Sequence, residues 1–391
     1  MDDRTFYLAL HLAPGFGPKK KMELLEGFNH IRDLFSVSSS ELAGIITGKA
    51  LSKFITDRNL LLNKADKEIE KAKKLGISIT HIGSQDYPSN LLSIPDPPIA
   101  FYYKGRLSQN DFNSIAVVGC REASSNGLRN SYRLGKGLAE QGIVVVSGLA
   151  KGIDGEAHKG CLERNGRTVA VLGCGIDKYF PREHRDLQDK IASTGCVLSE
   201  FSIGSDPIGF HFPMRNRVIC GLSVGVVVVE GSQDSGALYT AEFALDYGRE
   251  LYAYPGPAQS YQYSGTHLLI KKGAKLIENA GDLLEDLSLV LEFPSFKVTH
   301  TSTQKTNDHE ASLNKELLKL NLDRLSSLKD DEKLVYQYLS LKEVTSDSLV
   351  EQSGLQIEKV MSCLTSLIIK DLCIQVGNRY LRKSLEGENN V

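Results

Sequence analysis

The sequence predicts an α/β protein with a Rossmann-like, doubly wound parallel sheet, a small helical N-terminal domain and a winged-helix C-terminal domain. Two observations carry this prediction. Short runs rich in β-branched residues recur between positions 114 and 256, and segments of helical length separate them. The runs are apolar almost throughout, which is typical of a parallel sheet covered by helices on both faces.

Residues 1–78 are expected to form the small helical, SAM-like domain. Apolar residues recur at spacings of three and four over 24–35. The stretch LAPGFGPKKK places Gly15 and Gly17 before a helix start, in the pattern of a helix-hairpin-helix turn whose amides contact a DNA phosphate. A tight helix connection with a solvated lysine run at 19–21 explains the same residues slightly better, and both interpretations stay open.

Residues 79–291 are expected to form the extended Rossmann-like domain. Its predicted strands are SIAVVG (114–119), GIVVVSG (142–148), TVAVLG (168–173), VGVVVVEG (224–231) and LYAYPG (251–256). Its predicted helices lie in the segments 127–141, 154–165, 183–193 and 236–248. In an open parallel sheet, ligands bind beyond the carboxyl ends of the strands, so the loops at that edge are the expected binding site.

Residues 292–325 are polar and rich in Ser, Thr and Lys, and they predict a linker. Residues 326–391 then contain three helical units followed by CIQVGNRYLRK, a short hairpin with its turn at Gly377–Asn378. A helix, a helix-turn-helix and a β-wing together predict a winged-helix domain. Its third helix carries few cations beside Glu358 and Asp371, so we expect it to contact protein rather than read a DNA groove.

The composition indicates a globular protein. Its 391 residues suffice for two or three domains, and the formal net charge is -2, so any basic surface is local. Seven cysteines without a C-x-x-C pair indicate buried thiols in a reducing compartment. Acidic residues precede the short apolar N-terminal stretch and no apolar run reaches membrane-spanning length, so we expect a cytoplasmic protein with no membrane partner.

The motifs of common nucleotide and catalytic sites are incomplete. Neither 119–127 nor 173–180 completes G-x-G-x-x-G, and Arg121 lies where a glycine would let a pyrophosphate approach. The sequence has no G-x-x-x-x-G-K-[ST] and no H-x-x-x-H spacing, and no set of Ser, His and acid has a supporting G-x-S-x-G elbow. We therefore expect no cofactor, no metal and no catalytic residues, because a binding protein explains more of the sequence than an enzyme does.

The loop GCREASSNG (119–127) has the composition of a phosphate site. Arg121 offers a planar fork suited to bidentate binding of a phosphate, and Ser124 and Ser125 add hydroxyl donors. A structural salt bridge within the loop is the alternative role for Arg121. The binding role is favoured because small residues and helix starts recur in the other loops at this edge.

The stretch FHFPMRNR (210–217) combines aromatic rings with guanidinium groups. Its rings offer stacking faces for bases, and its later polar residues offer donors for phosphates, as single-stranded nucleic acid requires. The candidates are Phe212, Arg215, Asn216 and Arg217. In the alternative interpretation the aromatic residue packs in the core and the two arginines bind carboxylates such as Glu230.

Further basic residues border the same edge. Cations at the predicted helix start after Pro181 oppose the helix dipole, and an external anion would stabilise them. In SGLAKGIDGEAH, Asp154 is expected to cap the next helix, and His158 to pack rather than to catalyse. The basic candidates are Lys151, Arg182, His184 and Arg185, for which a solvated face is an equally good interpretation.

Several stretches, in order, resemble the bacterial DNA-processing family DprA, also called Smf. They are YPSNLLSIPDPPIAFYYKG, VVGCREASSNG, VVSGLAKGIDGEAHKGCL, TVAVLGCGIDKYFPREHRDL, FPMRNRVICGLSVGVVVVEGSQDSGALYTAEFALDYGRELYAYPG and GTHLLIKKGAKLI. The resemblance covers roughly residues 80–290. It implies a Rossmann-like domain that binds and protects incoming single-stranded DNA, forms a homodimer and loads the RecA recombinase in natural transformation.

The resemblance also implies roles for individual residues. The strand-binding pocket would be lined by Arg121, Arg215, Asn216 and Arg217, with Phe212 near the bases. Its backbone floor would be formed by Gly119, Ser147, Gly148, Ser235 and Gly236. Arg182 and Arg185 correspond to a family position with lysines.

Two other functions remain open at this point. The loop EGSQDSGALYTAEFA resembles P-G-G-x-G-T-x-x-E of nucleoside-monophosphate phosphoribohydrolases. However, Glu242 lies two residues after Thr240 rather than three, which turns its side chain by about 100° and argues against hydrolysis. A nucleoid-type protein that binds duplex DNA through its two end domains is the third function.

Overall fold

The structure is a computed structural model that describes residues 2–43, 48–108, 111, 113–290, 328–339, 344–370, 372–376 and 379–382. The chain divides into two compact units, Met1–Val298 and Thr299–Val391. The predicted linker at 292–325 and the predicted hairpin turn at Gly377–Asn378 lie outside the described residues.

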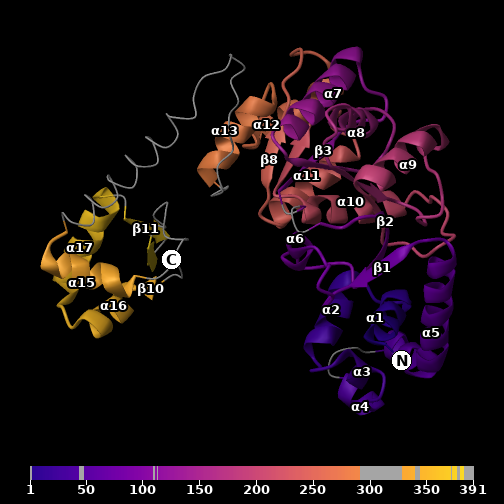
Figure 1. Ribbon diagram of the computed structural model, residues 1–391, viewed down its shortest axis with the longest axis horizontal. Coiled ribbons are helices and arrows are strands. Elements are labelled where there is room, and N and C mark those ends of the chain that lie inside the picture. Colours follow the sequence, from indigo (N-terminus) through magenta and orange to yellow (C-terminus); the bar gives the residue numbers. More distant parts are fainter. Residues whose placement is uncertain are drawn as a thin grey trace. The chain divides into compact units, whose positions relative to one another are not determined.

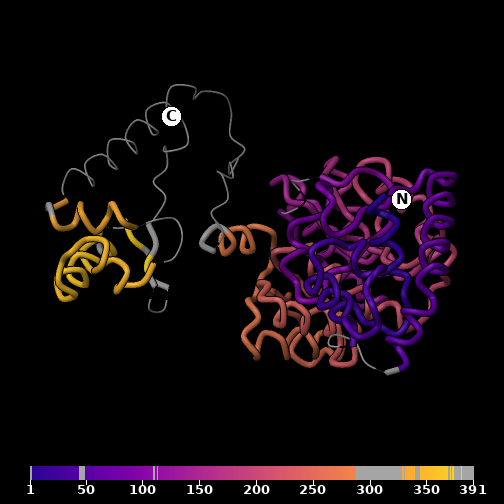
Figure 2. Tube along the Cα trace, turned by 90° about the horizontal axis from the view of Figure 1, so that it is seen from below, coloured from indigo at the N-terminus to yellow at the C-terminus, as the bar shows by residue number. Residues whose placement is uncertain are grey.

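The first unit begins with helices, as predicted. They are α1 (Asp3–Leu12), α2 (Pro18–Glu26), α3 (Ile31–Leu34), α4 (Ser39–Leu42) and α5 (Gly48–Lys74). Figure 1 shows them gathered beside strand β1 (Ser78–His81). Their apolar faces share one hydrophobic cluster with the sheet, in which Leu8 and Leu61 lie with Tyr102. Figure 2 shows from a second side that this indigo segment lies against the central part of the unit.

The turn between α1 and α2 uses its lysines internally. Gly15 has a φ of +85°, a conformation that favours glycine, and α2 begins directly after Gly17. The Lys21 ammonium donates to the His11 carbonyl, and burial lowers the pKa of Lys21 to about 8. Lys20 pairs with Glu23 at 2.6 Å. The expected run of solvated lysines is therefore wrong for Lys21.

The central sheet has nine strands in the order β1-β2-β6-β5-β4-β3-β7-β8-β9. After β1 these are β2 (Ala100–Gly105), β3 (Ser114–Val118), β4 (Val144–Ser147), β5 (Thr168–Leu172), β6 (Cys196–Ser199), β7 (Gly225–Val228), β8 (Glu250–Ala253) and β9 (Lys275–Leu276). Strands β3 to β9 pair in parallel, whereas β1–β2 and β2–β6 are antiparallel. The α/β prediction with a mostly parallel sheet is confirmed.

Helices cover both faces of this sheet. They are α6 (Ser89–Leu92), α7 (Ser125–Glu140), α8 (Ile153–Glu163), α9 (Arg185–Thr194), α10 (His211–Leu222), α11 (Ala237–Asp246), α12 (Ser264–Lys271) and α13 (Ala280–Val290). Alternate residues of β3 enter different cores. Ile115 and Val117 pack with α7, α8 and α13, and Ala116 and Val118 pack with α10 and α11.

Two central elements differ from the sequence-based expectation. The segment 211–222 was expected only to lead into the next strand, but it forms the helix α10. Strand β6 was not predicted, because its apolar run is only four residues long and lacks a glycine at its end. The helical geometry of α10 decides which way each of its side chains points.

The second unit contains the three predicted C-terminal helices. They are α15 (Asp330–Tyr338), α16 (Ser346–Ser353) and α17 (Ile357–Ile369). Three short strands, β10 (Val344–Thr345), β11 (Cys373–Val376) and β12 (Arg379–Arg382), form a sheet in the order β10-β12-β11. Val335, Leu349, Val360 and Leu367 form the centre of its core.

The structure leaves all seven cysteines as free thiols, and six of them are buried. In the part of the chain that the structure describes, none of the helices combines the length and the apolarity that a membrane span requires.

The buried His158 makes the stability of the first unit depend on pH. Its Nδ1 lies 2.7 Å from the Thr168 hydroxyl, and burial, with the nearby His184 and Arg215, lowers the pKa of His158 to about 3. The unfolded chain takes up this proton near pH 6.5 and the folded chain does not. The free energy of unfolding should therefore fall as the pH decreases from about 6.5 towards 3.

The variant His158→Asn keeps a polar partner for Thr168 and removes the titrating ring. Urea unfolding at a series of pH values should show a shallower decline of stability in the variant, by about one proton. An identical pH dependence in the two proteins would contradict this assignment.

Candidate functional site

The strand order places two loops together at the carboxyl edge of the sheet. Strand β3 lies between β4 and β7, so the chain direction across the sheet reverses there. We call the loops 119–124 and 229–236 the switch-point loops. The Cys120 amide donates to the Glu230 carbonyl at 2.8 Å, and the Val229 amide donates to the Val118 carbonyl at 3.0 Å. These bonds fix the two loops side by side, where open α/β sheets bind ligands.

An exposed guanidinium and two aromatic rings lie together at this edge. Arg121 is exposed, and its Cζ lies 5.0 Å from the centroid of the Phe212 ring. The Phe212 ring is in turn 5.5 Å from that of Phe180, which is 36% exposed. A Cβ at Gly173 would lie 2.8 Å from the Phe212 ring, so this glycine makes room for it. Sequence reasoning missed Phe180, although its place after a predicted strand was a usable signal.

Arg215 lies one helical turn after Phe212 on α10 and is 5% exposed. Its Nη1 donates to the carbonyls of Gly148 (2.7 Å) and Val171, and the structure shows no partner for Nη2 among the described residues. Burial lowers the pKa of Arg215 to about 10. The positive charge of Arg121 lowers this pKa further, whereas the negative charge of Asp154 raises it. We call Arg121, Phe180, Phe212 and Arg215 the Arg121 cluster.

The loop after β4 supports this cluster from below. A Cβ at Gly148 would lie 2.4 Å from Arg215 Nη2, so only glycine lets the guanidinium approach. The Gly148 amide donates to the buried Asp154 at 3.1 Å, and the Ser147 hydroxyl donates to the Val117 carbonyl at 2.6 Å. Burial raises the pKa of Asp154 and Arg215 opposes that rise. Ser147 and Gly148 are thus buried supports.

Arg217 lies in the core, away from the Arg121 cluster. Two helical residues correspond to about 200° of rotation, so Arg215 and Arg217 point to nearly opposite sides of α10. Arg217 is buried and donates to both carboxylate oxygens of Glu200, and its Nε lies 3.8 Å from Asp96. Burial acts to lower the pKa of Arg217, but Glu200 and Asp96 outweigh it and raise the pKa. The alternative prediction of a carboxylate partner holds for Arg217, with Glu200 rather than Glu230.

Three predicted residues meet where α10 faces the loop before α11. The Asn216 amide donates to the Gly236 carbonyl at 3.4 Å. The Ser235 hydroxyl accepts from the Ala237 amide at 3.3 Å. Gly236 is exposed and a Cβ there would meet nothing within 4 Å, so its backbone is open to a ligand.

The remaining cations lie in neighbouring loops, and no contact joins them to Arg121 among the described residues. Lys151 is exposed and pairs with Glu183 at 2.5 Å, which places it beside η2 (Arg182–His184). Arg182 is exposed. Arg185 is exposed and lies 4.9 Å over the Tyr179 ring.

The start of α7 is used internally. Ser124 is the N-cap of α7, and its hydroxyl accepts from the Gly127 amide at 3.1 Å and donates to the Glu230 carboxylate. Gly119 packs against Ile153, whose Cγ1 would lie 2.5 Å from a Cβ at that position. The predicted role of Ser124 as a free hydroxyl donor is therefore wrong.

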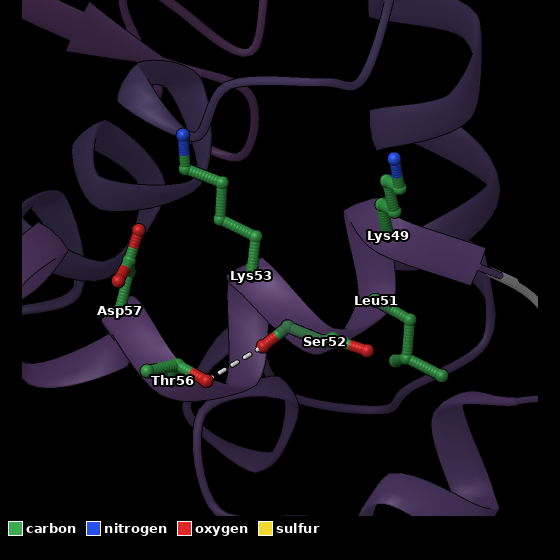
Figure 3. A pocket seen from close by; sticks show the side chains of 6 residues that line it. All are labelled: Lys49, Leu51, Ser52, Lys53, Thr56 and Asp57. Atoms are coloured by element: carbon green, nitrogen blue, oxygen red, sulfur yellow. Dashed lines mark hydrogen bonds between the residues drawn. The ribbon is translucent and has the colours of Figure 1, made fainter.

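Two surface hollows lie away from this edge. One, of about 720 Å³, is lined by residues of α5: Lys49, Leu51, Ser52, Lys53, Thr56 and Asp57 (Figure 3). Its Thr56 hydroxyl donates to the Ser52 carbonyl at 2.9 Å. The other, of about 580 Å³, borders α6. Neither of these two is lined by a predicted site residue.

Glu242, the acid of the alternative hydrolase interpretation, is exposed on α11. Over the described ranges, no group of three or more His, Cys, Asp or Glu side chains is arranged to hold a metal ion.

Comparisons with known proteins agree on one family. The model of the DNA recombination-mediator protein A family matches residues 78–288. Protein Smf of Synechocystis sp. is 35% identical over 295 residues, which cover 74% of this chain and 73% of that protein. DNA processing protein DprA of Streptococcus pneumoniae is 44% identical over 200 residues, which cover 51% of this chain and 71% of that protein. The X-ray structure of the pneumococcal protein aligns with a TM-score of 0.65 and 34% identity, over 72% of this chain and 97% of that one.

The buried ion pair of Arg217 should be needed for folding. Arg217→Leu leaves the Glu200 carboxylate buried without its partner, so the free energy of unfolding should fall by about 3–5 kcal/mol. Urea unfolding measures this loss. Adding Glu200→Gln removes the unpaired charge and should recover part of the stability, whereas a double variant no more stable than the single one would contradict this account.

Proposed function

We propose that this chain, which belongs to the DNA recombination-mediator protein A family, binds single-stranded DNA along the carboxyl edge of its central sheet. The observation that carries this proposal is the Arg121 cluster. It places two guanidinium groups beside two aromatic rings, and no carboxylate lies within ion-pair distance of either arginine among the described residues. An unpaired polynucleotide supplies the matching groups, since its phosphates pair with guanidinium groups and its bases stack on rings.

The proposed roles follow the exposure of each residue and, for the buried Arg215, the nitrogen that has no partner among the described residues. Arg121 binds a phosphate directly, and Arg215 offers its Nη2 to a neighbouring one. Phe180 and Phe212 stack with bases, while the open backbone at Gly236, held by Asn216, lets the strand approach closely. The path is extended by the basic residues Lys151, Arg182 and Arg185.

Other predicted residues shape the site without touching the strand. Arg217 and its carboxylate partners orient α10, and through it Phe212 and Arg215. The remaining supports are Gly119, Ser124, Ser147, Gly148 and Ser235. Because the site is an open edge of stacking faces and charges, it suits a splayed single strand better than a paired duplex.

The wider role is part of the same proposal. The protein acts without catalysis, as a cytoplasmic homodimer that protects a single strand and loads the RecA recombinase onto it, including strands taken up in natural transformation. The family name, recombination mediator, supports this role. We also propose four parts: a helical domain at 1–78 with a helix-hairpin-helix-like turn, the Rossmann-like domain at 79–291, a linker at 292–325 and a winged-helix domain at 326–391.

Removal of Arg121 tests the phosphate contact. Arg121→Ala should weaken binding of oligo-dT about tenfold, because one charge-assisted contact is lost. The slope of log affinity against log salt should become shallower by about 0.7. Fluorescence anisotropy titrations at several salt concentrations measure both quantities.

Arg164→Ala is the matched control. Arg164 follows the C-terminal end of α8 and pairs with Glu140 at 2.7 Å, so its loss removes the same charge far from the switch-point loops. If Arg121→Ala and Arg164→Ala lowered affinity and slope equally, the effect would be one of net charge and the site assignment would fail.

Removal of the Phe180 ring tests base stacking. Phe180→Leu should lower the affinity for oligo-dT by about 1 kcal/mol and leave the salt slope unchanged, because stacking involves no phosphate. Phe243→Leu removes a ring that stacks on Tyr247 at 5.6 Å in α11 and serves as the control. If Phe180→Leu bound oligo-dT as tightly as the wild type does, the proposal that Phe180 stacks with a base would be wrong.

A further inference from the structure

The amino end of α7 is the place where Rossmann-like folds commonly hold a phosphate. Helix α7 follows β3, the strand at the switch point, and the free amides of its first turn favour an anion. In this chain an internal carboxylate takes that position. The Ser124 amide donates to Glu230 Oε1 at 2.7 Å, and the Ser124 hydroxyl donates to Glu230 Oε2.

The first turn of α7 is shaped around this carboxylate. A Cβ at Gly127 would lie 2.2 Å from Glu230 Oε2, so the approach requires glycine at that position. Glu230 has 0% exposure, and its carboxylate already accepts from the Ser124 amide, so a second anion cannot take that donor. The Cys120 thiol lies 3.4 Å from Oε1 of Glu230. Burial raises the pKa of Cys120 to about 12, and the nearby negative charge of Glu230 contributes to the rise.

The charge of Glu230 is balanced without a cation. Among the described residues, its carboxylate has hydrogen-bond donors from the Ser124 amide and hydroxyl, the Cys120 thiol and the Tyr263 hydroxyl, and it takes part in no ion pair. A buried carboxylate held by such donors at a helix start is stabilised by the positive end of the helix dipole. A bound phosphate would have the same surroundings.

Glu230 also holds both ends of the loop that carries Arg121. Its carbonyl accepts from the Cys120 amide at 2.8 Å, and its carboxylate accepts from Ser124. Arg121 lies between these two attachment points. The direction of its side chain therefore depends on one residue of the neighbouring switch-point loop.

We infer that Glu230 is a built-in anion that occupies the phosphate position of the fold and positions Arg121 to bind a phosphate outside it. The consequence for DNA rests on the proposed function, whereas the occupied anion position does not. Glu230 is accordingly a positioning residue. An external phosphate cannot accept from the Ser124 amide while Glu230 holds it, and the phosphates of a strand meet Arg121 instead.

Chemical rescue tests the occupied position without DNA. Glu230→Ala removes one methylene and the carboxylate, which together have the size of acetate. The melting temperature of the variant in sodium chloride should lie several degrees below that of the wild type, and replacing chloride by acetate at equal ionic strength should recover part of the loss. Wild type and Glu122→Ala, which removes an exposed carboxylate from the same loop, should show no such gain.

Glu230→Gln keeps the shape of the side chain and removes its negative charge. It tests the inference even if Glu230→Ala does not fold. It fills the same space, so acetate should have no effect, and its melting temperature should lie below that of the wild type because the amide is neutral. Its oligo-dT affinity should fall several-fold as the Arg121 loop loosens. A Glu230→Gln protein as stable and as tight-binding as the wild type would overturn the inference, as would Glu230→Ala without any acetate gain.

Failure of the proposed function gives a different pattern. In that case oligo-dT would bind wild type and Arg121→Ala equally, while the acetate response of Glu230→Ala would persist.

Discussion

The pairing of β3 with both β4 and β7 is the constraint on which the rest of the site depends. Ile115 is in register with Val145 on one side and with Gly225 on the other, so the loops that follow β3 and β7 must leave the sheet together. Apolar residues on both faces of these strands pack into two separate cores, and a slip in register would move every side chain into the other core and disrupt both. The edge is therefore a rigid platform on which a few polar side chains are displayed.

The helical geometry of α10 separates two arginines that are almost adjacent in sequence. In an extended strand, Arg215 and Arg217 would share a face; in a helix they point apart. Arg217 meets Glu200 and Asp96 in the core, whereas Arg215 reaches carbonyls below the edge. One arginine thus pairs with core carboxylates, and the other keeps its Nη2 without a partner among the described residues.

Several buried charges act together to leave Arg121 free. Glu230 is satisfied by the start of α7, and Asp154 by the amides of Gly148 and Ala150. Glu230 and Asp154 already accept hydrogen bonds from these donors, and the carboxylates of Glu200 and Asp96 already face Arg217. None of these acids is therefore available to pair with the exposed Arg121. Buried groups with complete hydrogen bonding also make the loops stiff, which would lower the entropy lost in the proposed binding of a strand.

The sequence by itself determined the α/β class and five of the central strands, because apolar runs and their periodicity are local properties. It also determined the edge at which the polar loops gather, because these loops follow the carboxyl ends of strands that all run in the same direction. It also pointed to Arg121 and Phe212. Only the tertiary structure decided that α10 is a helix, that Arg217 and Ser124 are committed to internal carboxylates, and that Phe180 joins the edge. Those outcomes depend on partners distant in sequence, such as Glu200 and Glu230, and no local pattern specifies which partners a fold will bring together.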